Sequence, residues 1–426
     1  MISAVLFVSF FIFLIMGIPI GICLGLSSVC AILYSGTSLT IVATNMYSGI
    51  SKFLLLAIPF FVLSGNIMAK AGISKRLIRF VNTCVGHRRG GIAIVCVIVA
   101  CFFGAISGSG PATVAALGAV LIPAMIEQGG FSAPFSAALM ATASSIAIVI
   151  PPSIAFVVYA SITGVSIADM FTAGIVPGIL MGVALVIVVM IEARKNNIQS
   201  SQKRASGKER WEAFKDAFWG LLMPVIILGG IYGGIFTPTE AAAVSVIYSI
   251  IVGCVIYREL DLKKLIQCTK NACETTASIL IVIGCAAGFS KVLTLGRIPT
   301  TVASAMLALT DSKIVILLLI NVLLLIVGCF METLCAIMIL APILYPVVTA
   351  MGVDVTHFGI IMVVNLAIGF ITPPLGVNLF VASRVGETTL DTVIKGIIPF
   401  LILMIATLLC ITYIPAISMF LPNLMG

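Results

Sequence analysis

The chain has 426 residues, of which 61% are hydrophobic and only 9% are charged, and its mean hydropathy is +1.27. A soluble globular protein carries about 25% charged residues, so this chain lacks the charge needed to cover a water-facing surface. At about 20 apolar residues per crossing, its length allows roughly ten to fourteen membrane segments. The unbroken apolar runs exclude a β-barrel, whose strands alternate apolar and polar residues. The composition predicts an all-α polytopic membrane protein.

The first apolar run, 2–20, has neither a basic segment before it nor a small-residue cleavage site after it, and it is expected to be retained as a membrane segment. The 12 cysteines are scattered through apolar runs, and His87 and His357 lie far apart in sequence. This spacing predicts neither a metal centre nor a disulfide framework. The net charge of +8 is expected to reflect cytoplasmic loops rather than binding of nucleic acid.

Lysine and arginine gather in short clusters that predict the topology. Nineteen of the 23 basic residues lie within 70–89, 194–215 and 258–270 or are Arg384 and Lys395. Basic loops beside membrane segments stay on the cytoplasmic side. We therefore expect these clusters to be cytoplasmic and both termini to be periplasmic.

Short motifs recur about 222 positions apart and indicate two homologous halves. Gly-Ile-Val-Pro at 174–177 returns as Gly-Ile-Ile-Pro at 396–399, and the Pro-Pro pair at 151–152 returns at 373–374. Chance repetition is the competing interpretation in a chain rich in Ile, Gly and Pro, but the matches keep the same order. The predicted halves are residues 1–192 and 217–426, joined by a basic cytoplasmic linker, 193–216.

Equivalent loops of the two halves carry opposite charge patterns. The basic loop 70–89 corresponds to the sparsely charged loop 297–313, and the basic region 258–270 corresponds to the uncharged loop 34–47. The halves are therefore expected to have inverted topologies. Inverted repeats place substrate and ion sites near the membrane midplane, on interrupted helices.

Small residues and prolines interrupt two apolar runs of the first half. Ser-Gly-Ser-Gly-Pro-Ala-Thr at 107–113 breaks the run 92–126 and predicts a re-entrant helical hairpin, because irregular backbone at membrane depth must line protein or a cavity. Pro151 and Pro152 break the next run, close to Ser144 and Ser145. Unpaired carbonyls beside hydroxyl groups suit a small cation such as sodium. Close helix packing is the alternative explanation of the small residues.

The second half repeats both interruptions with different residues. Positions 328–333 match the first hairpin tip, and 369–378 match the first broken helix. Glu332 is the only acidic residue between Asp311 and Asp354. A carboxylate within the membrane is costly and therefore indicates a function. Three roles are open for Glu332: to bind a cation, to carry a proton, or to cap the broken helix.

Longer motifs lie at 56–66 (Leu-Ala-Ile-Pro-Phe-Phe-Val-Leu-Ser-Gly-Asn), 121–123 (Leu-Ile-Pro) and 236–242 (Phe-Thr-Pro-Thr-Glu-Ala-Ala). Together with the 107–113 tip, Gly-Ile-Val-Pro-Gly at 174–178 and Thr-Pro-Pro at 372–374, they resemble the large, DctM-like membrane subunit of the TRAP transporters, the tripartite ATP-independent periplasmic family. The resemblance runs nearly end to end.

The resemblance implies an elevator-type secondary transporter of the bacterial inner membrane that takes up a small organic acid, such as a C4-dicarboxylate, sialic acid or a sugar acid. Two or more sodium ions would drive uptake. The implied partners are a small four-helix membrane subunit, a periplasmic substrate-binding protein and membrane lipid. The resemblance also implies scaffold helices within 1–90 and 217–312. Transport-domain hairpins and broken helices are implied within 91–165 and 313–388.

By the same similarity, residues 109–113 look like the Ser-Asn-Thr hairpin tip of divalent anion/sodium symporters, with Gly and Pro in place of Asn and Thr. Backbone carbonyls are therefore expected to contribute more to ion binding. The expected sodium ligands are Ser107, Ser109, Gly110, Ser144, Ser145, Gly328, Glu332, Thr333, Gly369 and Thr372. The expected substrate contacts are Thr113, Ser145, Ser153, Thr372 and Asn378. No Lys or Arg is expected deep in this region, so cations and helix N-termini would attract the anion.

Three other functions compete with this one. A sodium/carboxylate symporter without a binding protein is the main alternative, and uptake by this chain alone would reveal it. An intramembrane enzyme with Glu332 as general base lacks a nucleophile beside it in the sequence. A purely structural scaffold leaves the paired interruptions unexplained. We therefore expect a transporter and not an enzyme.

Overall fold

The computed structural model describes residues 1–199 and 202–425, and within these ranges every regular element is a helix. Nine helices of this described part are long and apolar enough to span a membrane, and several shorter apolar helices accompany them. The prediction of an all-α, multi-pass membrane protein is therefore confirmed.

The first half begins with the helices α1 (Ile2–Ile15), α2 (Ile20–Ser35), α3 (Thr40–Ile50), the 3-10 turn η1 (Phe53–Leu56), α4 (Ala57–Lys70) and α5 (Ile73–Val85). A hairpin follows, made of α6 (Gly91–Ser107) and α7 (Gly110–Glu127). The next helix is broken into α8 (Ala133–Ser145), the 3-10 turn η2 (Ile146–Ile148) and α9 (Ile154–Thr163), and α10 (Ile167–Lys195) completes the half.

From the hairpin to the long helix after the broken helix, the second half repeats the order of elements of the first, but ahead of the hairpins the helices are divided differently. It begins with α11 (Gly207–Tyr232), α12 (Pro238–Ile250) with its π-helical end η3 (Ile251–Ile256), α13 (Leu262–Leu295) and α14 (Ile298–Leu309). The second hairpin is α15 (Lys313–Phe330) and α16 (Thr333–Ala350), and the second broken helix is α17 (Val355–Gly369) and α18 (Val377–Val385). The chain ends with α19 (Leu390–Tyr413) and α20 (Ala416–Met425). The elements thus repeat at the spacing seen between the sequence motifs.

The few polar residues of this apolar chain specify where helices begin. Ser206 with Glu209 and Thr237 with Glu240 form capping boxes at the starts of α11 and α12. In a capping box each side chain accepts a hydrogen bond from a backbone N–H of the other residue, so two N–H groups without helical partners are satisfied. Asp354 caps α17 in the simpler way, by accepting from the N–H of His357 at 2.9 Å. Apolar patterning alone does not set these boundaries.

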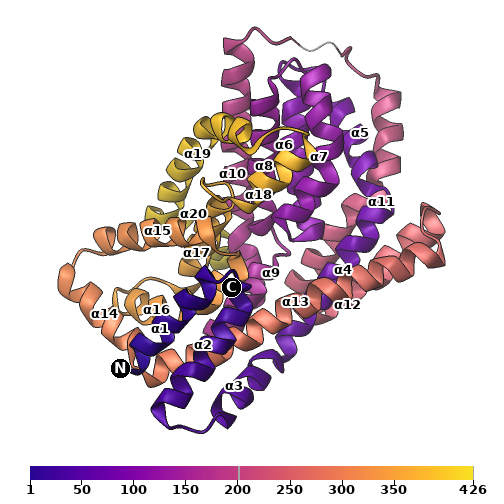
Figure 1. Cartoon of the computed structure of the whole chain (residues 1–426). Helices are drawn as coiled ribbons and strands as arrows, with labels where there is room; N and C mark the ends of the chain where they lie inside the picture. Colours follow the sequence, from indigo (N-terminus) through magenta and orange to yellow (C-terminus); the bar gives the residue numbers. More distant parts are fainter. Residues whose placement is uncertain (200–201, 426) are drawn as a thin grey trace.

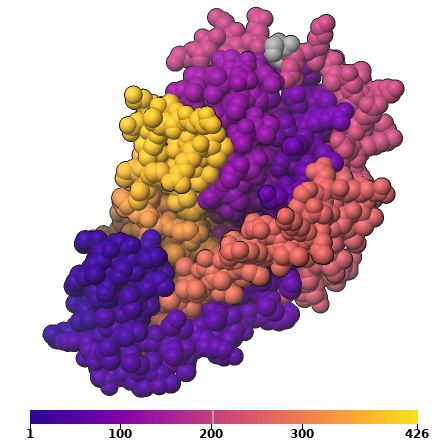
Figure 2. Space-filling view, turned by 45° about the vertical axis from the view of Figure 1, so that its right-hand side comes forward, coloured from indigo at the N-terminus to yellow at the C-terminus, as the bar shows by residue number. Residues whose placement is uncertain are grey.

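The broken helices interlock the two halves. The short helix α18 of the second half packs against α7 and α8 of the first, and α9 of the first half packs against α16 of the second. The 34-residue α13 crosses the molecule obliquely and packs against α2, α3, α4 and α16 (Figure 1). Figure 2 shows α13 crossing one face, with the C-terminal segment against first-half helices. Each hairpin therefore lies between its own broken helix and elements from the other half.

A cluster of charged residues joins α5 to α11 and to the end of η3. The guanidinium of Arg76 lies 3.2 Å from Asp216 and 2.6 Å from Glu259, and it stacks 3.9 Å from the centre of the Tyr257 ring. Arg79 also contacts Asp216, at 3.5 Å. Both carboxylates are thus already paired with arginines of α5.

A buried polar chain ties the second hairpin to the C-terminal helices. Asn365 of α17 donates to the side-chain oxygen of Asn321 in α15 at 2.7 Å, and Asn321 donates to the hydroxyl of Thr412 at 3.1 Å. The ring of His357 contacts the Thr412 carbonyl at 3.2 Å and the Ser418 hydroxyl at 2.6 Å. Partnered polar groups of this kind fix the relative positions of membrane helices.

Candidate functional site

The first hairpin tip is a short loop held together by its own hydroxyl groups. Gly108 ends α6 with φ of 60°, a left-handed conformation that glycine adopts at no steric cost, and Ser109 precedes α7 in an extended conformation. The hydroxyl of Thr113 lies 3.0 Å from that of Ser107 and donates to the Ser109 carbonyl at 2.8 Å. The carboxyl end of one helix and the amino end of the next therefore meet in a neutral, oxygen-rich loop.

The serines of the first broken helix lie behind this tip and bond to their own helix. Ser144 donates to the Ala141 carbonyl and Ser145 donates to the Thr142 carbonyl, both at 2.7 Å. Ser153, beyond the break, donates to the Ile148 carbonyl at 2.5 Å. All three serines are fully buried. Their hydroxyl protons are engaged, which leaves oxygen lone pairs free to accept.

Asn378 of the second half reaches into the first half. Its side-chain nitrogen donates to the Ala141 carbonyl at 3.2 Å and to the Ser144 hydroxyl at 3.1 Å. Its side-chain oxygen is buried without a partner, and a Cβ placed on Gly110 lies 3.1 Å from that oxygen. The tip, the first broken helix and the second broken helix therefore converge at Asn378.

The second hairpin tip carries a charge. Glu332 precedes α16 and accepts hydrogen bonds from the backbone N–H groups of Leu334 at 3.0 Å and Cys335 at 3.3 Å. Of the three roles that were open for Glu332, capping is therefore confirmed. The next residue, Thr333, is buried, and its hydroxyl oxygen has no hydrogen-bond partner. A carboxylate at a helix N-terminus is stabilised by the helix dipole, which lowers the cost of placing it at membrane depth.

The second tip also touches its broken helix through backbone. A Cβ placed on Gly369 lies 2.6 Å from the Cα of Gly328, a distance that real Cβ atoms do not reach. The thiol of Cys329 donates to the Thr372 carbonyl at 3.1 Å, and the hydroxyl of Thr372 donates back to Ile368 at 2.8 Å. Glycine at 328 and 369 therefore allows the backbones of α15 and α17 to come into contact at the end of α17.

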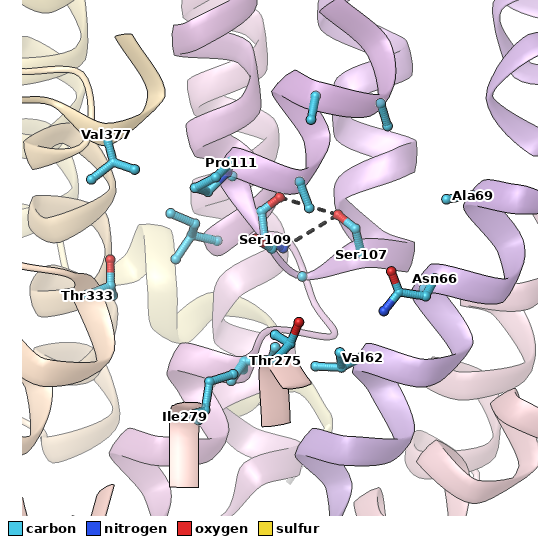
Figure 3. A pocket seen from close by; sticks show the side chains of 18 of the residues that line it. Val62, Asn66, Ala69, Ser107, Ser109, Pro111, Thr275, Ile279, Thr333 and Val377 are labelled. Atoms are coloured by element: carbon cyan, nitrogen blue, oxygen red, sulfur yellow. Dashed lines mark hydrogen bonds between the residues drawn. The ribbon is translucent and has the colours of Figure 1, made fainter. Parts of the chain in front are cut away.

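Both tips face a cavity of about 1080 Å³. One wall consists of the tips, with Ser107, Ser109 and Gly110 from the first and Glu332 to Cys335 from the second. The opposite wall consists of α2, α4, α5 and α13. Figure 3 shows Ser107 and Ser109 of the first tip between Thr333 on one side and Asn66 on the other. The cavity therefore lies between the two tips and these helices, while α16 also packs directly on α13, and α6 packs on α4 and α5.

The expected site residues divide into two groups. Five of them line the cavity: Ser107, Ser109, Gly110, Glu332 and Thr333. The others pack behind the cavity wall: Thr113, Ser144, Ser145, Ser153, Gly328, Gly369, Thr372 and Asn378. Among residues 1–199 and 202–425, no group of three or more His, Cys, Asp or Glu side chains is arranged to hold a metal ion. Hydroxyl, amide and backbone oxygens are thus the ligands on offer, together with the single carboxylate of Glu332.

Sequence reasoning missed the polar residues of the far wall. Asn66 of α4 and Thr275 and Ser278 of α13 line the cavity, as do Lys70 and Lys75. Both lysines are exposed and flank the α4–α5 turn, so no lysine lies deep at the tips, as expected, although two reach the cavity. Their basic cluster was visible in the sequence, but its position on the cavity wall depends on how α4 packs against α6.

A family model described as "Tripartite ATP-independent periplasmic transporter, DctM component" matches residues 7–417. The isethionate TRAP transporter permease protein DctMQ of Oleidesulfovibrio alaskensis is 48% identical over 98% of this chain, which spans 66% of that relative. The C4-dicarboxylate TRAP transporter large permease protein DctM of Pseudomonas aeruginosa is 44% identical, covering 95% of this chain and 94% of the relative. The sialic acid TRAP transporter large permease protein SiaM of Vibrio cholerae is 37% identical, covering 96% and 95%.

Solved structures show the same fold at low sequence identity. The Alcanivorax borkumensis YdaH transporter superposes with a TM-score of 0.63 at 18% identity, over 88% of this chain and 86% of that one. MtrF of Neisseria gonorrhoeae gives a TM-score of 0.63 at 14% identity, over 88% and 83%. The relatives are transporter permease proteins rather than enzymes. With its apolar helices, paired hairpins and an end-to-end family match, the chain belongs to the DctM component family of the tripartite ATP-independent periplasmic transporters.

Proposed function

We propose that this chain carries out sodium-coupled uptake of a small organic anion across the bacterial inner membrane. The observation that carries the proposal is the cavity lined by both hairpin tips, since it brings oxygen-rich breaks from the two halves to one space. A volume of about 1080 Å³ accommodates a small metabolite together with water. In this proposal α6–α9 and α15–α18 form the transport domain, and the helices within 1–90 and 217–312 form the scaffold of an elevator.

Two sodium sites are proposed, one at each tip. The first uses oxygens of Ser107, Ser109 and Gly110 with those of Ser144 and Ser145, and the second uses Gly328, Glu332 and Thr333 with Gly369 and Thr372. The buried, unpartnered hydroxyl of Thr333 supports the second site, and the buried, unpartnered side-chain oxygen of Asn378 lies beside Gly110 of the first. A buried polar atom without a partner is costly, and a bound cation would offset that cost.

The proposed substrate is a small anion held in the cavity between the tips, with Thr113, Ser145, Ser153, Thr372 and Asn378 packed behind the cavity wall. The names of the relatives support this class, since isethionate, C4-dicarboxylates and sialic acid are all small organic anions. Glu332 would repel an anion unless a cation is bound beside it. Bound sodium therefore supplies the counter-charge in this proposal, and the anion cannot bind well without it.

We also propose that a small membrane subunit and a periplasmic binding protein complete the transporter. The family description names a tripartite periplasmic system, and this chain leaves about a third of the isethionate relative unmatched. The ends of α10 and α11 that flank the basic linker lie at one end of the molecule, and the N-terminus and α14 lie at the other (Figure 1). We assign the linker end to the cytoplasm and both termini to the periplasm.

Uptake into proteoliposomes tests the proposal. The chain is reconstituted alone or with its small subunit, and labelled isethionate, succinate or sialic acid is supplied with and without the matching binding protein. The expected result is uptake that requires an inward sodium gradient, the small subunit and the binding protein. A potassium gradient of equal size is the control for ion specificity.

Each other outcome has a defined meaning. Sodium-driven uptake by the chain alone would favour the symporter that works without a binding protein. Uptake that ignores the sodium gradient would overturn the coupling proposal. No uptake of any of the three anions by the complete system would overturn the assigned substrate class.

A further inference from the structure

The charged residues of the cavity belong to different elements. Only Lys70, Lys75 and Glu332 are charged among the described residues that line it. Glu332 belongs to the second hairpin tip, whereas Lys70 ends α4 and Lys75 lies in the first turn of α5. The cavity therefore has a negative group at the second hairpin tip and two positive groups at the turn between α4 and α5.

One face of α4 leads from the first hairpin tip to the turn between α4 and α5. Val62, Asn66, Ala69 and Lys70 line the cavity at helical spacing, and α13 presents Thr275, Ser278 and Ile279 from the facing wall. In Figure 3, Val62, Asn66 and Ala69 follow one another along α4, beside the first tip. An anion that leaves the tips therefore passes amide and hydroxyl groups before it meets the lysines.

Neither lysine is neutralised by a neighbouring acid in the described part of the chain. The ion pairs there use Arg76, Arg79 and Lys270. The carboxylates nearest to the α4–α5 turn, Asp216 and Glu259, are both paired with Arg76. Both lysines are also exposed. Their positive charge is therefore available to a ligand in the cavity.

We propose that Lys70 and Lys75 form a second, weak site for organic anions at the cytoplasmic end of the cavity, which the substrate occupies on its way out. The proposal rests on the proposed function. A cleft lined by one sign of charge raises the local concentration of the opposite ion. Lysine suits an exit site because it is a flexible point charge, whereas arginine holds a carboxylate in a fixed two-bond geometry. When sodium leaves the tips, Glu332 repels the anion and the two ammonium groups attract it.

The test measures binding from the cytoplasmic side. Proteoliposomes contain the whole transporter, and binding protein is added outside only, so that uptake reports molecules whose cytoplasmic face is the lumen. Unlabelled substrate in the lumen then inhibits uptake, and the lumenal concentration for half-inhibition is measured. The probe is whichever of isethionate, succinate and sialic acid the wild-type system takes up.

The double variant Lys70→Gln/Lys75→Gln is expected to raise the half-inhibiting lumenal concentration about fivefold. The concentration of loaded binding protein that gives half-maximal uptake should stay within about twofold. Raising lumenal salt should weaken inhibition in the wild type and have little effect in the variant, because exposed charges are screened over about 8 Å at 0.15 M salt. Lys70→Arg/Lys75→Arg should retain lumenal inhibition.

The matched control is Lys195→Gln/Lys208→Gln, which removes two other basic charges outside the cavity and should behave as wild type. An unchanged half-inhibiting concentration in the cavity variant, or an equal change in the control, would overturn the proposal. If the wild-type transporter shows no sodium-driven uptake, the proposed function itself is overturned. Thermal unfolding of each variant in detergent identifies any change caused by misfolding.

Discussion

The two hairpin tips have the same backbone plan and different chemistry. In each, one helix ends and another begins within three residues, beside a broken helix. The first tip is neutral, and its Ser107 and Thr113 hydroxyl groups form hydrogen bonds within it. The second has the Glu332 carboxylate at the helix start and leaves the Thr333 hydroxyl without a partner. The plan is therefore duplicated, but the second tip carries the charge and the unmet hydrogen-bonding capacity.

This difference predicts a division of labour. A neutral, internally bonded loop changes little when an ion leaves, so the first tip should be stable without sodium. The second tip holds a carboxylate close to an unpartnered hydroxyl, so its free energy should depend strongly on a bound cation. Substitutions at the second tip should therefore have larger effects than the matching substitutions at the first.

The largest effect is expected where the second tip meets its broken helix. Gly369→Val places a branched side chain against the backbone of Gly328, so folding should be destabilised by about 3 kcal/mol. Thermal unfolding and the yield of folded protein in detergent measure this cost. The first half offers a matched control, because the equivalent residue there is Ala147, which packs on Gly104. Ala147→Gly should cost less than about 1 kcal/mol, and equal costs would contradict the asymmetry.

The next largest effect is expected at the residue before the second helix of each hairpin, which is Ser109 in the first and Glu332 in the second. Glu332→Ala removes a charge and two hydrogen bonds, so the sodium concentration for half-maximal uptake should rise about tenfold, or about 1.4 kcal/mol. Ser109→Ala should change it about twofold or less, because the Ser109 side chain makes no capping hydrogen bond. Glu332→Gln removes the charge but keeps a side-chain oxygen that can cap the helix, so it distinguishes the contribution of the charge from that of the hydrogen bonds. Equal sensitivity of both tips to alanine would contradict the proposed division of labour.

Sequence alone predicted the places where helices are interrupted. Glycine, serine and proline within apolar runs are physically unsuited to a continuous membrane helix, so the tips at 107–113 and 328–333 were visible without a structure. The all-helical fold and the family followed from composition and from the long motifs. What each hydroxyl bonds to was not visible, because Ser144 and Ser145 donate to carbonyls of their own helix, and spacing carries no information on that choice.

Contacts between the two halves could not be predicted from the sequence either. Asn378 was predicted as a substrate contact, but its bond to the Ser144 hydroxyl depends on α18 packing against α8, which no local pattern encodes. The two cavity lysines were assigned to a cytoplasmic loop from their charge. Their position on the cavity wall follows from the turn between α4 and α5, which tertiary packing fixes.

A smaller difference in stability is expected between Thr113 and Thr333, the last residues of the two tips. Thr113→Val breaks two hydrogen bonds and should lower the free energy of unfolding by about 1 kcal/mol. Thr333→Val removes an unpartnered hydroxyl, so stability without sodium should change by less than about 0.5 kcal/mol. Sodium should then stabilise the Thr333 variant less than the wild type. Thermal unfolding with and without sodium measures both quantities, and an unchanged sodium effect would remove Thr333 from the second site.

The smallest effect is expected at Lys52, which precedes η1 and donates to the Ser161 carbonyl in the last turn of α9. A cation at a helix C-terminus is stabilising by about 0.3–1 kcal/mol, and this one links the proposed scaffold to the first broken helix. If the hairpins move relative to the scaffold, the bond must break in the other state. Lys52→Met should therefore shift the population toward that state and change the external half-saturating sodium concentration about twofold. Lys52→Arg should retain the wild-type value, and equal values for both variants would mean that α9 and η1 keep their contact throughout transport.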